Sequence, residues 1–175
     1  MAKKKDKPCD LDNLKTSLQT LVDSFEAEFS RGYYQCSLAY EKWIEGLLDD
    51  TLWDGGNSKD DIERRLDVND YMLLNLIDAR RCAAKYLGEC VPLLKGEKAD
   101  LLTEIVSLYR KITEQLGSFR NKLKAGDGEN LRYNAIDTKN STCYLKEQAE
   151  LLQSIPQTEK EIAEKAKRII AYPIQ

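Results

Sequence analysis

Histidine is absent from this chain of 175 residues. Its absence excludes the histidine-ligated di-iron sites of haemerythrin-like and ferritin-like bundles, the Ser-His and Cys-His pairs of nucleophilic catalysis, and the zinc sites of zincins. Gly-x-Gly-x-x-Gly and Walker-type loops are also missing, so the sequence offers no phosphate cradle of the usual kinds. We therefore expect no metal and no cofactor, and we favour a protein without catalysis of its own.

Long apolar runs are missing too. No segment approaches the ~18 apolar residues of a transmembrane helix, and the first residues lack the apolar core of a secretory signal. The five cysteines are widely spaced without a Cys-x-x-Cys pair, which favours reduced thiols and no disulfide. The net charge of −3, with both signs interspersed, indicates no basic surface for nucleic acid. We expect a soluble, cytoplasmic protein that binds neither membrane nor nucleic acid.

Apolar residues recur at helical spacing through most of the chain, and strand patterns are essentially lacking. Amphipathic helices are expected over residues 10–29, 33–53, 58–91, 97–124 and 141–171. The third should begin at an N-cap box from Ser58 to Asp61, and Pro156 should kink or divide the fifth. Short connections between long helices predict an all-α, antiparallel bundle of about five amphipathic helices. Residues 10–175 should form this single domain, after a disordered basic lead-in or linker over residues 1–9.

Arg80 lies in the middle of the apolar arc of the third expected helix. A guanidinium that points inward needs a carboxylate or an anionic ligand, because an unpaired buried charge costs several kcal/mol or more. The same helical wheel places Asp50 on the apolar arc of the second helix and both Gln148 and Glu159 on that of the last. Two acidic residues on different helices are therefore expected to face the interior that Arg80 enters.

Two interpretations of these inward polar residues stay open. In the first, Arg80 pairs with Asp50 or Glu159 in a buried network that sets the register of the helices. In the second, the helices enclose a cleft whose polar groups orient a ligand. The candidate ligand-binding residues are Arg80, Asp50, Glu159, Gln148, Tyr40, Trp43 and Tyr109. A catalytic carboxylate pair is the weakest interpretation, because no further catalytic residues accompany the two acids.

Three groups of spaced residues carry a family resemblance. They run from Gly32 through Ala39-Tyr40-x-x-Trp43-x-x-x-Leu47 to Asp50, from Asn69 through Ala79-Arg80-Arg81-x-Ala83-Ala84-x-Tyr86-Leu87, and from Leu101 through Tyr109 to Leu116. From about Pro8 to Tyr172 the chain resembles the helical domain that follows a papain-like or C39-peptidase-like domain in bacterial proteins of the butirosin biosynthesis protein H type. In that family the nucleophile, where there is one, belongs to the preceding domain. The resemblance therefore implies an accessory or ligand-binding helical module.

These observations lead to one expected function and one alternative. We expect a non-catalytic module that binds a small molecule or peptide in a cleft between helices. In that cleft Arg80 would meet an anionic group, and Tyr40, Trp43 and Tyr109 would pack on apolar parts of the ligand. The alternative is a protein-interaction or accessory module that docks a papain-like catalytic partner.

Overall fold

Helices account for nearly all of the computed structural model, which describes residues 10–27, 29–30, 32–53, 56–124 and 138–171. The helices are α1 (Leu11–Glu26), α2 (Cys36–Leu48), α3 (Asp50–Trp53), α4 (Lys59–Cys90), α5 (Glu97–Lys124) and α6 (Thr138–Ile170). A 3-10 turn (Val91–Leu93) and two short strands, β1 (Phe29–Ser30) and β2 (Tyr33–Tyr34), complete the elements. The expected all-α bundle is confirmed. The expected basic lead-in, residues 1–9, lies outside the described residues.

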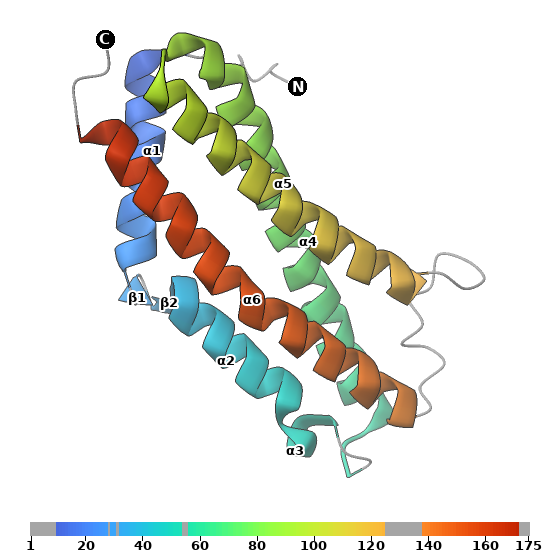
Figure 1. Cartoon of the computed structure of the whole chain (residues 1–175). Helices are drawn as coiled ribbons and strands as arrows, with labels where there is room; N and C mark the ends of the chain where they lie inside the picture. The colour runs from blue at the N-terminus through green and yellow to red at the C-terminus, as the bar shows by residue number, and fades with distance from the viewer. Residues whose placement is uncertain (1–9, 28, 31, 54–55, 125–137, 172–175) are drawn as a thin grey trace, which may run out of the picture.

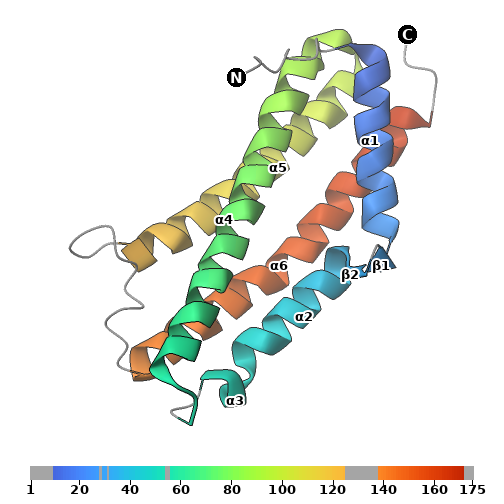
Figure 2. The same ribbon diagram turned by 180° about the vertical axis from the view of Figure 1, so that it is seen from behind.

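The long helices form four antiparallel columns. The first column consists of α1 followed by α2, and α4, α5 and α6 are the other three (Figure 1). Main contacts join α4 to α5, α5 to α6, and α6 to both α1 and α2. The fourth side, where α4 faces α1 and α2, has few contacts. We call it the open side, and Figure 2 looks onto it, with α4 on the left and α1 and α2 on the right.

A small hairpin divides the first column. Phe29 pairs with Tyr34 in an antiparallel register, and their rings meet edge to face with centroids 5.7 Å apart. Gly32, with φ of +87°, takes the left-handed conformation that the reversal of the chain requires. The second expected helix, over residues 33–53, is therefore wrong at both ends. It begins only at Cys36, and it breaks at Asp49, whose carboxylate accepts hydrogen bonds from the amide and hydroxyl of Thr51.

The later helices agree with the sequence more closely. The Ser58 hydroxyl oxygen accepts a hydrogen bond from the amide of Asp61 at 3.1 Å, so the expected N-cap of α4 is confirmed. Pro156 lies within α6, which continues through it, so of the two expected effects, a kink or a division, the division does not occur. The helix continues because residues on both sides of the proline are packed in the core, including the fully buried Ile155 and Ile162.

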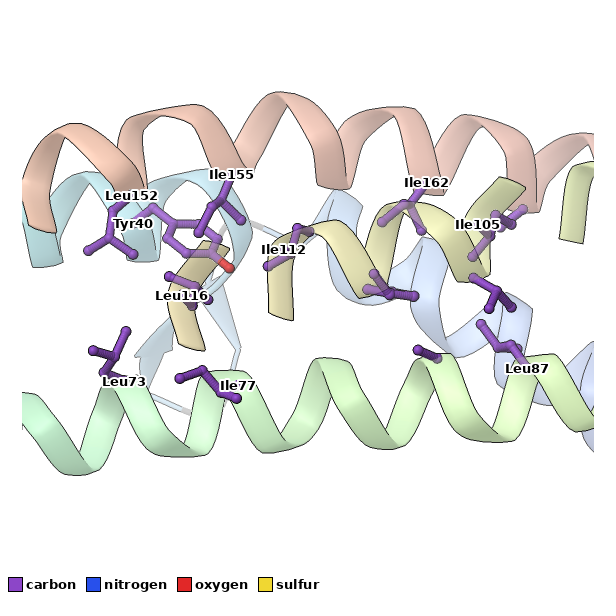
Figure 3. Packing of buried hydrophobic residues seen from close by; sticks show 14 of the residues in the cluster. Tyr40, Leu73, Ile77, Leu87, Ile105, Ile112, Leu116, Leu152, Ile155 and Ile162 are labelled. Carbon is purple, nitrogen blue, oxygen red and sulfur yellow. The ribbon is translucent and has the colours of Figure 1, made fainter. Parts of the chain in front are cut away.

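The core runs along the axis of the bundle. Figure 3 shows side chains from four columns meeting there, with Leu73 and Ile77 on α4, Ile112 on α5 and Leu152 on α6. Tyr40 reaches from α2 into the same core and is only 5% exposed. Each long helix thus buries its apolar stripe against at least one neighbour, which is the main source of stability in such a bundle. No helix in the described part of the chain is long and apolar enough to cross a membrane.

The cysteines differ from the expectation of reduced thiols. Cys36, Cys82 and Cys143 are free, whereas Cys90, fully buried at the end of α4, is disulfide-bonded. The prediction that no disulfide forms is therefore wrong at Cys90. Spacing along the chain does not show which thiols a fold brings together, and for this reason the sequence could not settle the point.

Candidate ligand-binding site

Arg80 forms an ion pair with Glu159 across the interior of the bundle. The guanidinium Nε donates to Glu159 Oε1 at 2.6 Å, and Nη2 lies 2.5 Å from the same oxygen. The Tyr40 hydroxyl donates to that oxygen at 3.0 Å and accepts a hydrogen bond from Arg80 Nη2 at 3.5 Å. Glu159 is 8% exposed and the Arg80 side chain 26%. The inward position expected for Arg80 is confirmed, and the partner is Glu159.

Asp50 does not take part in this cluster. It is exposed in the first turn of α3, so its expected position on an inward face is wrong. The helical wheel assumed one continuous helix as far as Trp53. Because α2 ends at Leu48, the chain leaves that helical path before it reaches Asp50, and the wheel does not apply there.

A second polar contact crosses the interior between the same two helices. Asn69 on α4 and Gln148 on α6 exchange amide hydrogen bonds of 2.8 and 3.0 Å. The indole Nε1 of Trp43 donates to Asn69 Oδ1 at 2.8 Å. Gln148 is 1% exposed and Asn69 4%, so the pair satisfies groups that would be costly to bury alone. The hydrogen bond from Trp43 to Asn69 fixes the orientation of the indole on the open side, between α2 and α4.

Both polar contacts lie on one diagonal of the bundle. α4 and α6 run parallel, and Asn69–Gln148 and Arg80–Glu159 have the same sequence separation of 79 residues. Their levels are 11 residues apart on each helix, about three turns or 16 Å, so they fall on nearly the same face. A slip of α6 along α4 by one turn would break both contacts, and together they define the register of the two helices.

Burial and the ion pair shift the pKa values around Arg80. Burial raises the pKa of Tyr109 to about 12, and burial together with the Glu159 carboxylate raises that of Cys36 to about 11. Burial and Glu159 also raise the pKa of Tyr40. Burial disfavours the charged form of Arg80, but the nearby Glu159 carboxylate outweighs it and raises the pKa overall. At neutral pH the two tyrosines and the thiol are therefore protonated, and Arg80 is charged.

The cluster borders a hollow of about 310 Å³ on the α1 part of the open side, which we call the α1 hollow. Its polar lining consists of Ser17, Thr20, Ser24, Cys36, Arg80, Tyr86, Tyr109 and Glu159. The Cys36 thiol donates to the Ser24 carbonyl oxygen at 2.8 Å, and this bond ties the start of α2 to the end of α1. Cys36 has φ of +45°, a strained value for a residue other than glycine.

A larger hollow lies beside α2, and we call it the α2 groove. It measures about 610 Å³ and is mostly apolar. Its lining residues are Tyr33, Tyr34, Ala39, Lys42, Trp43, Gly46, Leu47, Leu52, Trp53, Arg64, Arg65, Val68, Asn69 and Met72. Trp53 donates its indole Nε1 to the Gly46 carbonyl oxygen at 2.8 Å, and an Arg65 Nη1 group donates to the Leu52 carbonyl oxygen. These bonds hold α3 across the end of the groove.

The candidate residues therefore divide between two hollows instead of one cleft. Arg80, Glu159 and Tyr109 line the α1 hollow, and Trp43 lines the α2 groove. Tyr40 and Gln148 are buried behind these walls and hold the lining residues in place.

Sequence reasoning missed another buried ion pair. Arg120 Nε and Nη2 donate to the two carboxylate oxygens of Asp70 at 2.8 and 2.7 Å, joining α5 to α4. A signal was present, because Asp70 follows Leu66 by four residues and precedes Leu73 by three, which places it on the apolar stripe. The pair lines neither hollow and has a structural role.

Comparisons with known proteins identify no relative. No family model, no curated protein and no solved structure matches the chain. Within the described residues, no group of Cys, Asp and Glu side chains could hold a metal ion. The two hollows are therefore the candidate sites of function in the described part of the chain.

Proposed function

We propose that the chain is a non-catalytic binding module that takes up a small molecule or a peptide on its open side, with the α2 groove as the main site. One observation carries this proposal, namely an apolar groove of about 610 Å³ whose wall includes the indole of Trp43. Such a combination of apolar surface and a few fixed polar groups is typical of ligand sites.

The walls of the groove are held in place before any ligand arrives. Asn69 and Gln148 fix the ring of Trp43, and the bond from Trp53 to Gly46 fixes α3. Rigid walls reduce the conformational entropy that binding would otherwise cost. The groove is thus suited to binding without rearrangement of the bundle.

The sequence suggested that Arg80 binds an anionic group of the ligand, whereas in this proposal Arg80 holds the helices together through its pair with Glu159. Glu159 neutralises its charge, so the α1 hollow is a weak site for an anion. Tyr109 lines that hollow, and its hydroxyl has no hydrogen-bond partner among the described residues. The α1 hollow therefore suits a neutral, hydrogen-bonding part of a ligand, while the Arg80–Glu159 pair holds the helices around it.

The alternative function is docking of a papain-like catalytic partner. The hairpin between α1 and α2 supports it, because Phe29 is 60% exposed and Tyr33 is 73% exposed. Aromatic residues at the protein surface are common in protein interfaces. Replacement of Phe29, which does not line the α2 groove, by serine should weaken co-purification with such a partner, whereas it should leave small-molecule binding in the α2 groove intact.

Glycine 46 offers a direct test of the groove. A Cβ atom at Gly46 would meet no atom within 4 Å, so Gly46→Leu adds a side chain to the groove without a clash in the bundle. Gly117→Leu on α5 is a matched control, because Gly117 also lies in a helix, has the same free space and lines neither hollow. Both changes should stabilise their helices by roughly 0.5–1 kcal/mol, because leucine has a higher helix propensity than glycine.

The probe is the apolar anionic dye 1-anilinonaphthalene-8-sulfonate, followed by its fluorescence. We expect the wild-type chain and Gly117→Leu to bind the dye alike, and Gly46→Leu to bind it about tenfold more weakly because the groove is filled. Equal binding by all three proteins, or no binding by the wild-type chain, would contradict the proposal. Circular dichroism melting curves show that each variant is folded.

A further inference from the structure

The α2 groove is open rather than enclosed. Among the described residues seven large apolar side chains are exposed, and four of them line this groove, namely Tyr33, Tyr34, Val68 and Met72. Their exposed fractions lie between 43% and 73%. Small-molecule sites bury most of the ligand inside a concave wall, whereas exposed apolar patches of this kind mark contacts with other proteins.

The groove has the shape of a helix-binding site. On α2 its lining extends from Ala39 to Leu47, and on α4 from Arg64 to Met72. Each stretch covers nine residues, a little more than two turns, with a rise of about 12 Å. The two helices have few contacts with each other there, although both are packed on other columns. An added helix could lie between them with apolar residues at i, i+3 or i+4, and i+7.

The charged residues of the groove indicate the net charge of the helix that it would bind. Three lining residues are basic, Lys42 on α2 and Arg64 and Arg65 on α4, and none is acidic. Lys42 already pairs with Glu45 at 2.6 Å. Arg64 is exposed and forms no hydrogen bond or ion pair within the described part of the chain. The groove therefore complements a negatively charged partner, with Arg64 as its most available cation.

We infer that the α2 groove docks an acidic amphipathic helix of a partner protein. The apolar face of this helix packs against Trp43, Val68 and Met72, and its flanking carboxylates meet Arg64 and Lys42. The inference rests on the proposed binding function, since it specifies the occupant of the same groove. Gly46 faces the helix and leaves space for its closest side chain.

The test is a selection from a displayed library of amphipathic helices about 14 residues long, with Glu, Lys and Gln allowed at the flanking positions. The library is selected on the wild-type chain, and clones that also bind Gly46→Leu are removed. We expect the remaining clones to be enriched in Glu at the flanking positions. Remaining clones without this enrichment would overturn the inference.

One selected acidic peptide and its Glu→Gln counterpart are then compared by fluorescence anisotropy. We expect Arg64→Glu in the protein, or Glu→Gln in the peptide, to weaken binding about tenfold, and higher salt to weaken the acidic peptide alone. The control Arg81→Glu, at an exposed arginine of α4 outside the groove, should leave the affinity unchanged. Equal affinity of the two peptides would contradict the inference.

The dye experiment separates this inference from the proposed function. If dye binding depends on Gly46 but no peptide clone does, the groove binds small molecules and the helix inference is wrong. If neither dye nor peptide binding depends on Gly46, both proposals fail. Self-association that depends on Gly46 in sedimentation experiments would assign the groove to a second copy of the chain and also overturn the inference.

Discussion

Arg80 on α4 and Glu159 on α6 meet through a single carboxylate oxygen, which lies 2.6 Å from Nε and 2.5 Å from Nη2 of the arginine. The two helices are diagonal in the bundle and have few other contacts. The ion pair therefore acts as a cross-brace, and the Asn69–Gln148 pair is a second brace about 16 Å away along the same diagonal. These two contacts hold α4 at a fixed distance from α6. The open side therefore keeps its width although α4 does not pack closely on α2.

Removal of the first brace should be costly. We expect Arg80→Ala to lower the free energy of unfolding by about 3 kcal/mol, because Glu159 would remain buried without its partner. Arg81→Ala is the control, since Arg81 is exposed and pairs only with Asp78 on its own helix. It should change stability by less than about 0.5 kcal/mol. Urea unfolding gives both values, and equal effects would show that the Arg80–Glu159 pair contributes nothing.

Replacement of the whole brace should be tolerated. We expect the triple variant Arg80→Met, Glu159→Leu and Tyr40→Phe to unfold within about 1 kcal/mol of the wild-type chain, because apolar groups can replace a buried ion pair without loss. The Asn69–Gln148 pair would still set the register. A triple variant less stable than Arg80→Ala alone would show that the ion pair is needed for folding itself.

Apolar periodicity predicted α5 with its observed bounds and the inward position of Arg80, because both depend on a continuous helix. The prediction that Asp50 faces Arg80 was wrong because it assumed that the helix continues through Asp49. A hydrogen bond from the Thr51 amide to the Asp49 carboxylate accompanies the end of the helix there. Two-residue strands are too short for alternation to show, so the hairpin at Phe29 and Tyr34 gave no pattern. The groove itself depends on how two helices are spaced, and a helical wheel contains no such information.

The second brace should control the fluorescence of Trp43 as well as stability. Asn69→Ala removes the acceptor of the Trp43 indole and both bonds to Gln148, so we expect a loss of roughly 1–3 kcal/mol in unfolding free energy. Asn75→Ala, at an exposed asparagine of the same helix, should have almost no effect. The emission spectrum of Trp43 in a Trp53→Phe background should shift with Asn69→Ala only. An unchanged spectrum would contradict the proposed role of Asn69.

Stability should decline in alkaline solution as the buried groups around Arg80 ionise. The pKa of Cys36 is raised from 9.0 to about 11 and that of Tyr109 from 10.0 to about 12, and that of Tyr40 is also raised. Between about pH 9 and pH 12 the unfolded chain therefore releases protons that the folded chain retains, and the free energy of unfolding falls as the pH rises. Below about pH 9 this contribution is fully present.

Urea unfolding at pH 7, 9, 10 and 11 measures how steeply the free energy of unfolding falls with pH. Two tyrosine variants show whether Tyr109 contributes to this fall. Tyr109→Phe should make the decline shallower, because one group with a raised pKa is removed. Tyr33→Phe should leave the decline unchanged, since Tyr33 is 73% exposed on the hairpin. An identical slope in both variants would mean that Tyr109 does not contribute to the alkaline loss, and that its burial beside Arg80 and Glu159 has no thermodynamic consequence.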